Sequence, residues 1–470
     1  MDLIRQPLNF FKGTINNQFS GKEPWQIVTI TTSTVLITVW LYELIHEEES
    51  LAERGKKCIF KMIRLIPQLR KKIEDELQKV SQGFEDEVRE RTKHLRYMLY
   101  LPEDGLGSDD ILKQLQTNLG LGDYNWKNGS VSGTVYYHNP ELISLLGDVY
   151  KQTSYTNPLH PDIFPGVCKM EAEVIRIAAN LFHGDEESCG TLAGSAPNFP
   201  YGTMDDIQAI SELGLKYDIP VHVDSCLGGF LSCFMEDAGY PIPLCDFRLP
   251  GVTSISADTH KYGFTPKGSS VILYRHKKYR HHQYTVTTEW PGGVYGSPSV
   301  GGSRAGGNIA VCWATMLSFG KAGYVKATRD IIHTTKYIEK GLKRIKGIFI
   351  FGQPVTSVIA IGSCDFDIYR LSTALLAKGW SLNNLQFPPG IHICVTHMHV
   401  APGVADRFVE DVKSSISEIM KDPSLPVEGK MAIYGAAQEI PDRSIVGDFT
   451  RLFLDTMYYV PKKNLVNGEH

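Results

Sequence analysis

The sequence predicts an α/β protein that has a parallel β-sheet, a smaller C-terminal α+β domain and an amino-terminal helix able to span a membrane. Helical patterns alternate with short apolar strands between residues 204 and 274, an order typical of parallel sheets. A strand–helix–strand order returns between residues 357 and 400 and indicates the smaller domain. A stretch without charged side chains runs from Trp25 to Tyr42 and is just long enough for a membrane helix.

Composition limits the class of protein and its compartment. The chain has 470 residues, of which 42% are hydrophobic and 21% charged, and this suits two or three globular domains. A net charge of −4 gives no electrostatic reason to expect nucleic acid as a partner. The nine cysteines are an odd number without a CxxC pair. They therefore indicate reduced thiols in the cytosol and not a disulfide framework.

The amino-terminal apolar stretch begins too late, and lacks the small-residue cleavage site, for a signal peptide. Its aromatic ends, Trp25, Trp40 and Tyr42, suit the two interfaces of a bilayer. A buried helix of a soluble protein is the remaining alternative. Three basic residues precede the stretch and eight lie between residues 54 and 72, so the positive-inside rule places the bulk of the chain in the cytosol.

The pattern along the chain predicts five segments. Charged amphipathic patterns follow the apolar stretch and read as spacer helices. The globular body begins near residue 125, and its first strong helix is predicted at 169–182 from the spacing of its apolar residues. The segments are a lumenal stretch at 1–24, a transmembrane helix at 25–45, a helical linker at 46–124, a large domain at 125–323 and a small domain at 324–470.

Two residues suited to cofactor chemistry stand at the ends of predicted strands. Asp224 ends the strand in "PVHVD", and Lys261 closely follows the strand in "GVTSISAD". In parallel sheets, ligands bind at the carboxyl ends of the strands. A lysine amine can hold pyridoxal phosphate as an imine, while a carboxylate stabilises the protonated ring nitrogen of that cofactor. His260 lies within reach of a cofactor phosphate. Taken singly, Asp224 also suits a helix N-cap and Lys261 a solvent-facing loop.

Histidines near the C-terminal domain's last predicted strand do not indicate a metal site. His392, Cys394, His397 and His399 alternate along the strand pattern and have no carboxylate or CxxC pair beside them. No metal is therefore predicted.

Several motifs together resemble the sphingosine-1-phosphate lyase family, whose members are membrane-anchored and related to the group II pyridoxal-phosphate decarboxylases. The motifs are "VSGTVYYHNPEL", "NPLHPDIFPG", "HVDSCLGGFL", "SISADTHKYGFTPKGSS" and "LQFPPGIHICVT". The resemblance runs from the apolar stretch to near the C-terminus. It implies the aspartate aminotransferase (type I) fold, with a large parallel-sheet domain and a smaller α+β domain.

The resemblance also implies a role for each matching residue. Lys261 is expected to be the Schiff-base lysine, Asp224 the partner of the pyridine nitrogen, and Lys267 the group that binds the substrate phosphate. Tyr136 and His160 match positions that line the substrate head group and assist proton transfer. Positions Gly302, Ser303 and Arg304 match a glycine-rich loop that reaches a cofactor phosphate across a dimer interface.

The implied reaction is a retro-aldol cleavage of a phosphorylated sphingoid base into a long-chain aldehyde and phosphoethanolamine. The implied setting is a homodimer at the endoplasmic reticulum membrane, anchored by a single span, with its catalytic body in the cytosol. Two alternatives stay open: an amino-acid decarboxylase of the same superfamily, and a non-catalytic chain that pairs with an intact lyase.

The chain departs from the family pattern at one place. After "FHGDEESCGT" the family continues with a Ser-Gly-Gly-Thr-Glu loop that cradles the cofactor phosphate, and later with a histidine that stacks on the cofactor ring. Here Thr191 is followed directly by "LAGSAPNFPYG", and the Ser-Gly-Gly-Thr-Glu sequence is absent from the chain. We therefore predict that the large domain is internally shortened near residues 191–192 and that the cofactor is bound poorly or not at all.

Overall fold

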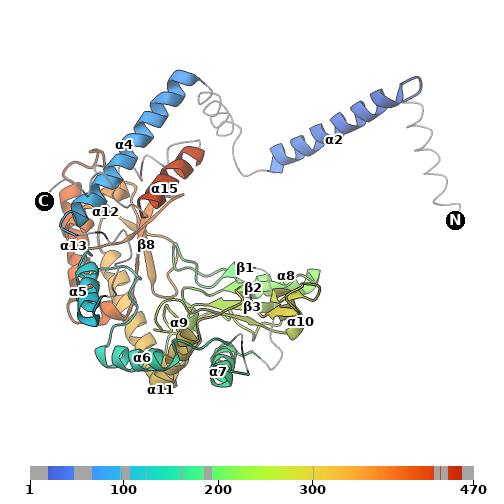
Figure 1. The fold of residues 1–470 in the computed structure, drawn as a ribbon. Helices are drawn as coiled ribbons and strands as arrows, with labels where there is room; N and C mark the ends of the chain where they lie inside the picture. The colour runs from blue at the N-terminus through green and yellow to red at the C-terminus, as the bar shows by residue number, and fades with distance from the viewer. Residues whose placement is uncertain are drawn as a thin grey trace. The chain divides into compact units, whose positions relative to one another are not determined.

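The computed structural model describes residues 19–46, 66–95, 97, 106–122, 124–158, 160, 162–184, 193–299, 301–427, 435 and 443–457. The chain divides into two compact units (Figure 1). The first unit consists of Met1–Leu101 together with Glu439–His470, and the second is Pro102–Gln438. The linker predicted at 46–124 is thus divided between the two units. The predicted junction at 191–192 lies outside the described residues.

The described residues of the first unit are mostly helical. Its helices are α2 (Pro24–His46), α4 (Pro67–Thr92) and α15 (Arg443–Met457). Helix α15 packs against α4, where the rings of Phe84 and Phe453 meet edge to face at 5.4 Å. The helix predicted at 25–45 is present as α2. However, among the residues that the structure describes no helix is both long and apolar enough to cross a membrane, so the predicted span is not confirmed.

The second unit contains two sheets and the remaining helices (Figure 1). Its helices are α5 (Ser108–Leu119), η1 (Trp126–Asn128), α6 (Pro140–Thr153), α7 (Pro165–Leu181), α8 (Ile207–Tyr217), α9 (Gly229–Met235), α10 (Lys277–Arg280), η2 (His281–Gln283), α11 (Gly306–Leu342), α12 (Ile368–Ala377), η3 (His397–Val400) and α13 (Val404–Ile419). A short hairpin is formed by β5 (Thr285–Thr287) and β6 (Tyr295–Ser297).

The first sheet has the strand order β1-β2-β3-β4, formed by β1 (Ala193–Ser195), β2 (Val221–Asp224), β3 (Val252–Ala257) and β4 (Val271–Tyr274). The first three strands are parallel, as the sequence predicts. Helix α8 packs on β1 and β2, α9 on β3, and α7 on β4. Strand β4 is antiparallel to β3. A parallel β4 would need a crossover, usually a helix, and the connection from Ala257 to Val271 contains no helix.

The second sheet is antiparallel, with the order β7-β8-β10-β9. Its strands are β7 (Phe349–Ile350), β8 (Val358–Gly362), β9 (Asn383–Leu385) and β10 (Gly390–Cys394). Helices α11 and α12 pack on this sheet, and α13 packs on those helices, which gives the α+β arrangement predicted for the C-terminal part. The predicted boundary at 323–324 falls inside α11, which is kinked at Gly320 (φ 58°, ψ 175°).

Two histidines of the smaller sheet region are buried in their neutral form. His392 places Nδ1 2.9 Å from the carbonyl oxygen of Pro200, and the His399 Nδ1 accepts a hydrogen bond from the Thr396 amide. Burial lowers the pKa of each imidazole to about 4. Below the pKa of a histidine in the unfolded chain, the unfolded chain therefore binds protons that the folded protein does not bind. This difference lowers the free energy of unfolding.

We expect the free energy of unfolding to fall as the pH drops from about 6.5 towards about 4, by about 3 kcal/mol for each of the two histidines. Denaturant unfolding of the wild type and of His392→Asn/His399→Asn, at about pH 7 and about pH 5, measures this fall. Asparagine keeps one hydrogen bond at each position without a titrating ring. The prediction is wrong if the two proteins lose equal stability between these pH values.

Candidate active site

Lys261 lies just beyond the carboxyl end of β3, where an ion pair fixes it. Its Nζ is 2.8 Å from Oδ2 of Asp258, and the Lys261 side chain is 21% exposed. Asp258 also accepts a hydrogen bond of 2.5 Å from the Ser270 hydroxyl. Burial alone would lower the pKa of Lys261, but the hydrogen bond to Asp258 and the interactions with Cys226 together outweigh it and raise the pKa above its usual value. Asp258 is therefore the group that holds the lysine amine.

The turn that carries Lys261 is fixed by close backbone packing. A side chain at Gly263 would place its Cβ 2.4 Å from the carbonyl oxygen of Thr259, so only glycine fits there. Phe264 has a positive φ of 61° and donates its amide to the Lys261 carbonyl. The hydroxyls of Thr259 and Thr265 both hydrogen-bond to that of Ser269. This network returns the chain to β4 and keeps Lys261 at the sheet edge.

Asp224 ends β2, the parallel neighbour of β3, so it lies at the same edge of the sheet. Its Oδ1 accepts hydrogen bonds from the Cys226 amide (2.9 Å) and the Ser256 hydroxyl (3.1 Å). Burial works against ionisation, yet these hydrogen bonds hold the pKa of Asp224 below its ordinary value. Asp224 is thus an anion at neutral pH. Cys226 links it to the lysine turn, because the Cys226 carbonyl accepts from the Asp258 amide.

Small residues after Asp224 allow α9 to pack closely against the strands. A Cβ on Gly229 would lie 2.9 Å from that of Ala257, and a Cβ on Gly228 would overlap Pro197. Ser225 is buried and donates to the Ala196 carbonyl. We interpret these residues as the contact between α9 and the strands.

Tyr136 and Lys267 lie together on another side of the site. The Lys267 Nζ is 5.0 Å from the centre of the Tyr136 ring, a cation–π contact. Burial and then the positive charge of Lys261 lower the pKa of Lys267. Burial raises the pKa of the Tyr136 phenol, so its hydroxyl stays protonated. The ring of Tyr136 also meets that of Tyr262 edge to face at 4.9 Å.

The remaining predicted site residues make no hydrogen bond to Lys261 or Asp224 in the described part of the chain. His260 Nδ1 donates to the Ser269 carbonyl at 2.6 Å, and its Nε2 is 3.9 Å from Asp258. The side chain of His160 is exposed, and among the described residues it makes no hydrogen bond to the other site residues. Gly302 lies beside Tyr295, and the amide of Arg304 in the same loop donates to Asn157; within the described part of the chain, Gly302 and Ser303 make no hydrogen bond to Lys261 or Asp224. The catalytic and binding roles predicted for these residues, and for Lys261, Asp224, Tyr136 and Lys267, stay predictions.

The described residues fit pyridoxal phosphate in two respects. A lysine amine stands beside an acceptor that can take its proton, and an ionised carboxylate stands at the neighbouring strand end. The Ser-Gly-Gly-Thr-Glu loop that the resemblance expects at the cofactor phosphate is absent from the sequence, and the place after Thr191 where the family has it borders residues outside the described ones.

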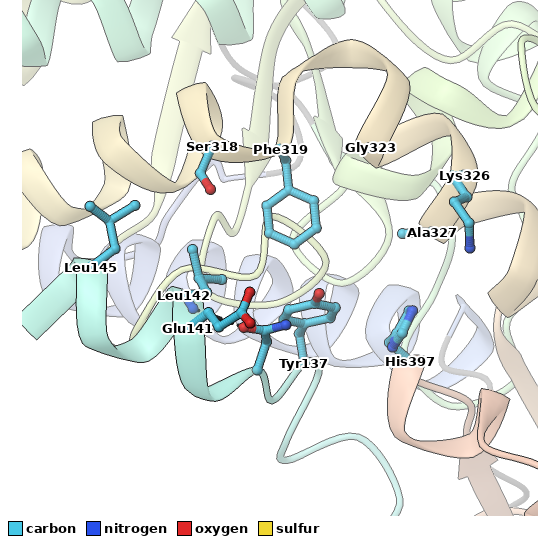
Figure 2. A pocket seen from close by; sticks show the side chains of 11 residues that line it. Tyr137, Glu141, Leu142, Leu145, Ser318, Phe319, Gly323, Lys326, Ala327 and His397 are labelled. Atoms are coloured by element: carbon cyan, nitrogen blue, oxygen red, sulfur yellow. Dashed lines mark hydrogen bonds between the residues drawn. The ribbon is translucent and has the colours of Figure 1, made fainter.

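A separate cavity of about 540 Å³ lies between α6, α11 and η3. Figure 2 shows Phe319 and Tyr137 facing one another there, with Lys326 and His397 at one end and Leu142 and Leu145 at the other. None of the predicted site residues lines this cavity. It is therefore distinct from the site around Lys261.

Comparison with known proteins gives concordant matches. The family described as "Pyridoxal-dependent decarboxylase conserved domain" matches residues 193–361. A Drosophila melanogaster protein named sphingosine-1-phosphate lyase is 52% identical, over 96% of this chain and 97% of its own length. A Mus musculus protein named sphingosine-1-phosphate lyase 1 is 40% identical, over 97% of this chain and 94% of its own length.

The structural matches agree with the sequence matches. The structure of a Burkholderia pseudomallei sphingosine-1-phosphate lyase superposes with a TM-score of 0.70 at 30% identity, covering 79% of this chain and 99% of that one. A Lactobacillus brevis glutamate decarboxylase, 18% identical, has a TM-score of 0.58, covering 72% of this chain and 98% of that one, and supports the fold alone.

The alignment with the fly protein is longer than this chain, and the predicted shortening near residues 191–192 stays a prediction. It spans 528 positions, more than the 470 residues of this chain, so it includes positions of the fly protein that have no counterpart here. The decarboxylase-family match also begins at residue 193, directly after the predicted junction.

Proposed function

The chain belongs to the sphingosine-1-phosphate lyase family, and we propose that it cleaves phosphorylated sphingoid bases into a long-chain aldehyde and phosphoethanolamine with pyridoxal phosphate as cofactor. The observation that carries the proposal is the Lys261–Asp258 ion pair at the sheet edge where Asp224 also stands. Pyridoxal phosphate, when bound, supplies an electron sink for the carbanion left by cleavage of the carbon–carbon bond.

Each residue of the site has a definite task in this reaction. Lys261 Nζ must lose a proton before it can act as a nucleophile, and Asp258 at 2.8 Å accepts hydrogen bonds from that nitrogen. Asp224 stays ionised and balances a positive ring nitrogen. The ammonium of Lys267 attracts the phosphate of the substrate. The protonated hydroxyl of Tyr136 donates a hydrogen bond to the substrate head group.

The proposal is tested with the full chain supplied with excess pyridoxal phosphate. Sphingosine 1-phosphate is the substrate, and mass spectrometry follows the long-chain aldehyde and phosphoethanolamine. Equal release of both products supports the proposal. Cofactor-loaded protein that releases neither product refutes it, and release of carbon dioxide from amino acids would instead identify a decarboxylase.

The shortened segment is expected to weaken cofactor binding. A helix amino terminus that cradles a phosphate contributes several hydrogen bonds, so we predict a dissociation constant about 10–100-fold above that of the fly lyase. Titration of both apo-proteins with pyridoxal phosphate, followed by visible absorbance, measures the ratio. Equal affinities would show that the lost loop is not needed to hold the phosphate.

We also place the chain in a homodimer, with Gly302 and Ser303 reaching the partner's cofactor phosphate. Support comes from the β5–β6 hairpin that precedes this loop. Val286, Trp290 and Val294 on and between its strands are 66%, 56% and 80% exposed, an apolar cluster that a partner subunit would cover.

The variant Trp290→Ala/Val294→Asp is expected to raise the dimer dissociation constant by at least about 30-fold, because it removes an aromatic anchor and introduces a charge. Sedimentation equilibrium measures the change. Leu213→Asp, on the exposed side of α8, is the matched control and should leave the dimer intact. Equal dissociation constants for the two variants would place the interface elsewhere.

We further propose that the chain is held at the endoplasmic reticulum membrane through α2, with its body in the cytosol. Support comes from the uncharged stretch of α2, where exposed Val28, Val35 and Leu36 could contact lipid. The hydroxyls of Thr29, Thr34 and Thr38 donate to helix carbonyls four residues earlier, which lowers their cost in lipid. Resistance to carbonate extraction, and protease digestion of the body in sealed vesicles, would support the proposal. Release by carbonate would refute it.

A further inference from the structure

A second site candidate lies on the C-terminal part of the large unit, between the last turns of α11 and those of α13. The two helices enclose a groove of about 710 Å³. Four basic side chains line it: Lys340, Arg344, Lys346 and Lys413. None of the residues around Lys261 takes part.

The positive charge of this groove is mostly uncompensated. Glu410 is the single acidic residue among those that line it, and its carboxylate is 3.5 Å from Lys413 Nζ. Lys340, Arg344 and Lys346 have no ion pair within the described part of the chain. Three like charges in one concave site repel one another, and an anion between them would relieve that repulsion.

The floor of the groove is apolar. Ile345 and Val409 are half-buried, Ile416 is buried, and Met420 is 40% exposed. Gly341 sets the depth, because a Cβ there would lie 2.8 Å from a Val409 methyl carbon and would push the helices apart. The groove therefore offers hydrocarbon contact below a basic rim.

Basic residues near the end of a helix also have a simpler role. Lys340 lies in the last turn of α11, and Arg344 and Lys346 follow it, where cations interact favourably with the helix dipole. That role accounts for the charge alone. It does not account for a cavity with an apolar floor at the same place, which is large enough for a small ligand.

We propose that this groove binds a single-chain anionic amphiphile, in which a phosphate or carboxylate head meets the basic rim and an alkyl chain lies on the apolar floor. Its volume falls within the range of small-molecule sites, whereas a flat bilayer surface cannot enter a groove between two helices. The proposal does not depend on the activity assigned to Lys261.

The test uses the full chain in zwitterionic lipid nanodiscs and a dodecyl phosphate that carries a photoreactive diazirine on its alkyl chain. After irradiation, peptide mapping is expected to find the label between residues 337 and 346 or between 409 and 420. Lys340→Ala/Arg344→Ala should reduce this labelling at least about tenfold. The control Lys216→Ala/Lys421→Ala removes two lysines outside the groove and should leave it unchanged.

Three outcomes would overturn the proposal. They are labelling that is equal in the two double variants, labelling that is equal with a neutral dodecanol diazirine, and no label on either helix. If the cations serve only the helix dipole, Lys340→Ala/Arg344→Ala lowers the thermal midpoint while the label stays in place. A label on the Lys261 peptide reports the proposed active site and is scored separately.

Discussion

Replacing Lys261 with alanine is expected to lower kcat/KM by at least about 10³-fold and to abolish covalent trapping of pyridoxal phosphate by borohydride. Nζ of Lys261 is the amine held by Asp258 at the sheet edge, and the alanine variant has no nucleophile at that place. Steady-state cleavage of sphingosine 1-phosphate measures the first effect. Peptide mapping after borohydride reduction measures the second.

Lys267→Ala is the matched control, because it removes a second lysine of the same turn. This variant should keep the borohydride label on Lys261 and should mainly raise KM, since the substrate phosphate loses its ammonium partner. The Lys261 assignment is wrong if Lys261→Ala protein is still trapped, or if the label maps to Lys267 in the wild type. Comparable thermal midpoints for both variants exclude misfolding as the cause.

The positions of Asp224 and Lys261 could be predicted from the sequence because they depend on topology. Asp224 and Lys261 follow consecutive strands of an α/β pattern, and the carboxyl ends of parallel strands lie at one edge of a sheet. The structure confirms that placement. The nearness of Tyr136 to Lys267 came from the family resemblance, since 130 residues of chain separate them and no local pattern predicts the contact.

Asp258 was missed as the partner of Lys261, although it stands three residues earlier in the same motif. Its role depends on the turn after β3, in which the backbone reverses through Gly263 and Phe264 and brings carboxylate and amine together. Local patterns in the sequence do not define such a turn. The signal available was the carboxylate itself, at a strand end within one turn of the lysine.

The direction of β4 and the continuity of α11 were also beyond prediction from the sequence pattern. Periodicity indicates a strand at 271–274 but not its orientation, which agrees with a connection after β3 that contains no helix. The sequence pattern changes near Tyr324 and predicts a domain boundary there. The helix nevertheless continues through the kink at Gly320, since packing on both domains stabilises it as one element.

Replacing Asp224 with asparagine is expected to reduce kcat by about 10²–10³-fold with little loss of stability. The amide oxygen of asparagine can still accept hydrogen bonds from the Cys226 amide and the Ser256 hydroxyl, so the strand end keeps its structure. What disappears is the negative charge that would balance a protonated ring nitrogen. The low pKa of Asp224 keeps this charge across the neutral range, so the deficit should be nearly independent of pH above about 5.

The variant Asp258→Asn distinguishes the role of Asp224 towards the cofactor ring from the role of Asp258 towards Lys261. It removes the ion partner that raises the pKa of Lys261, so borohydride trapping should reach its maximum at lower pH than in the wild type. Asp224→Asn should leave the pH profile of trapping in place and slow only turnover. The opposite result is that Asp224→Asn shifts the pH profile of trapping and leaves kcat unchanged. In that case Asp224 acts on the lysine and Asp258 acts on the cofactor ring.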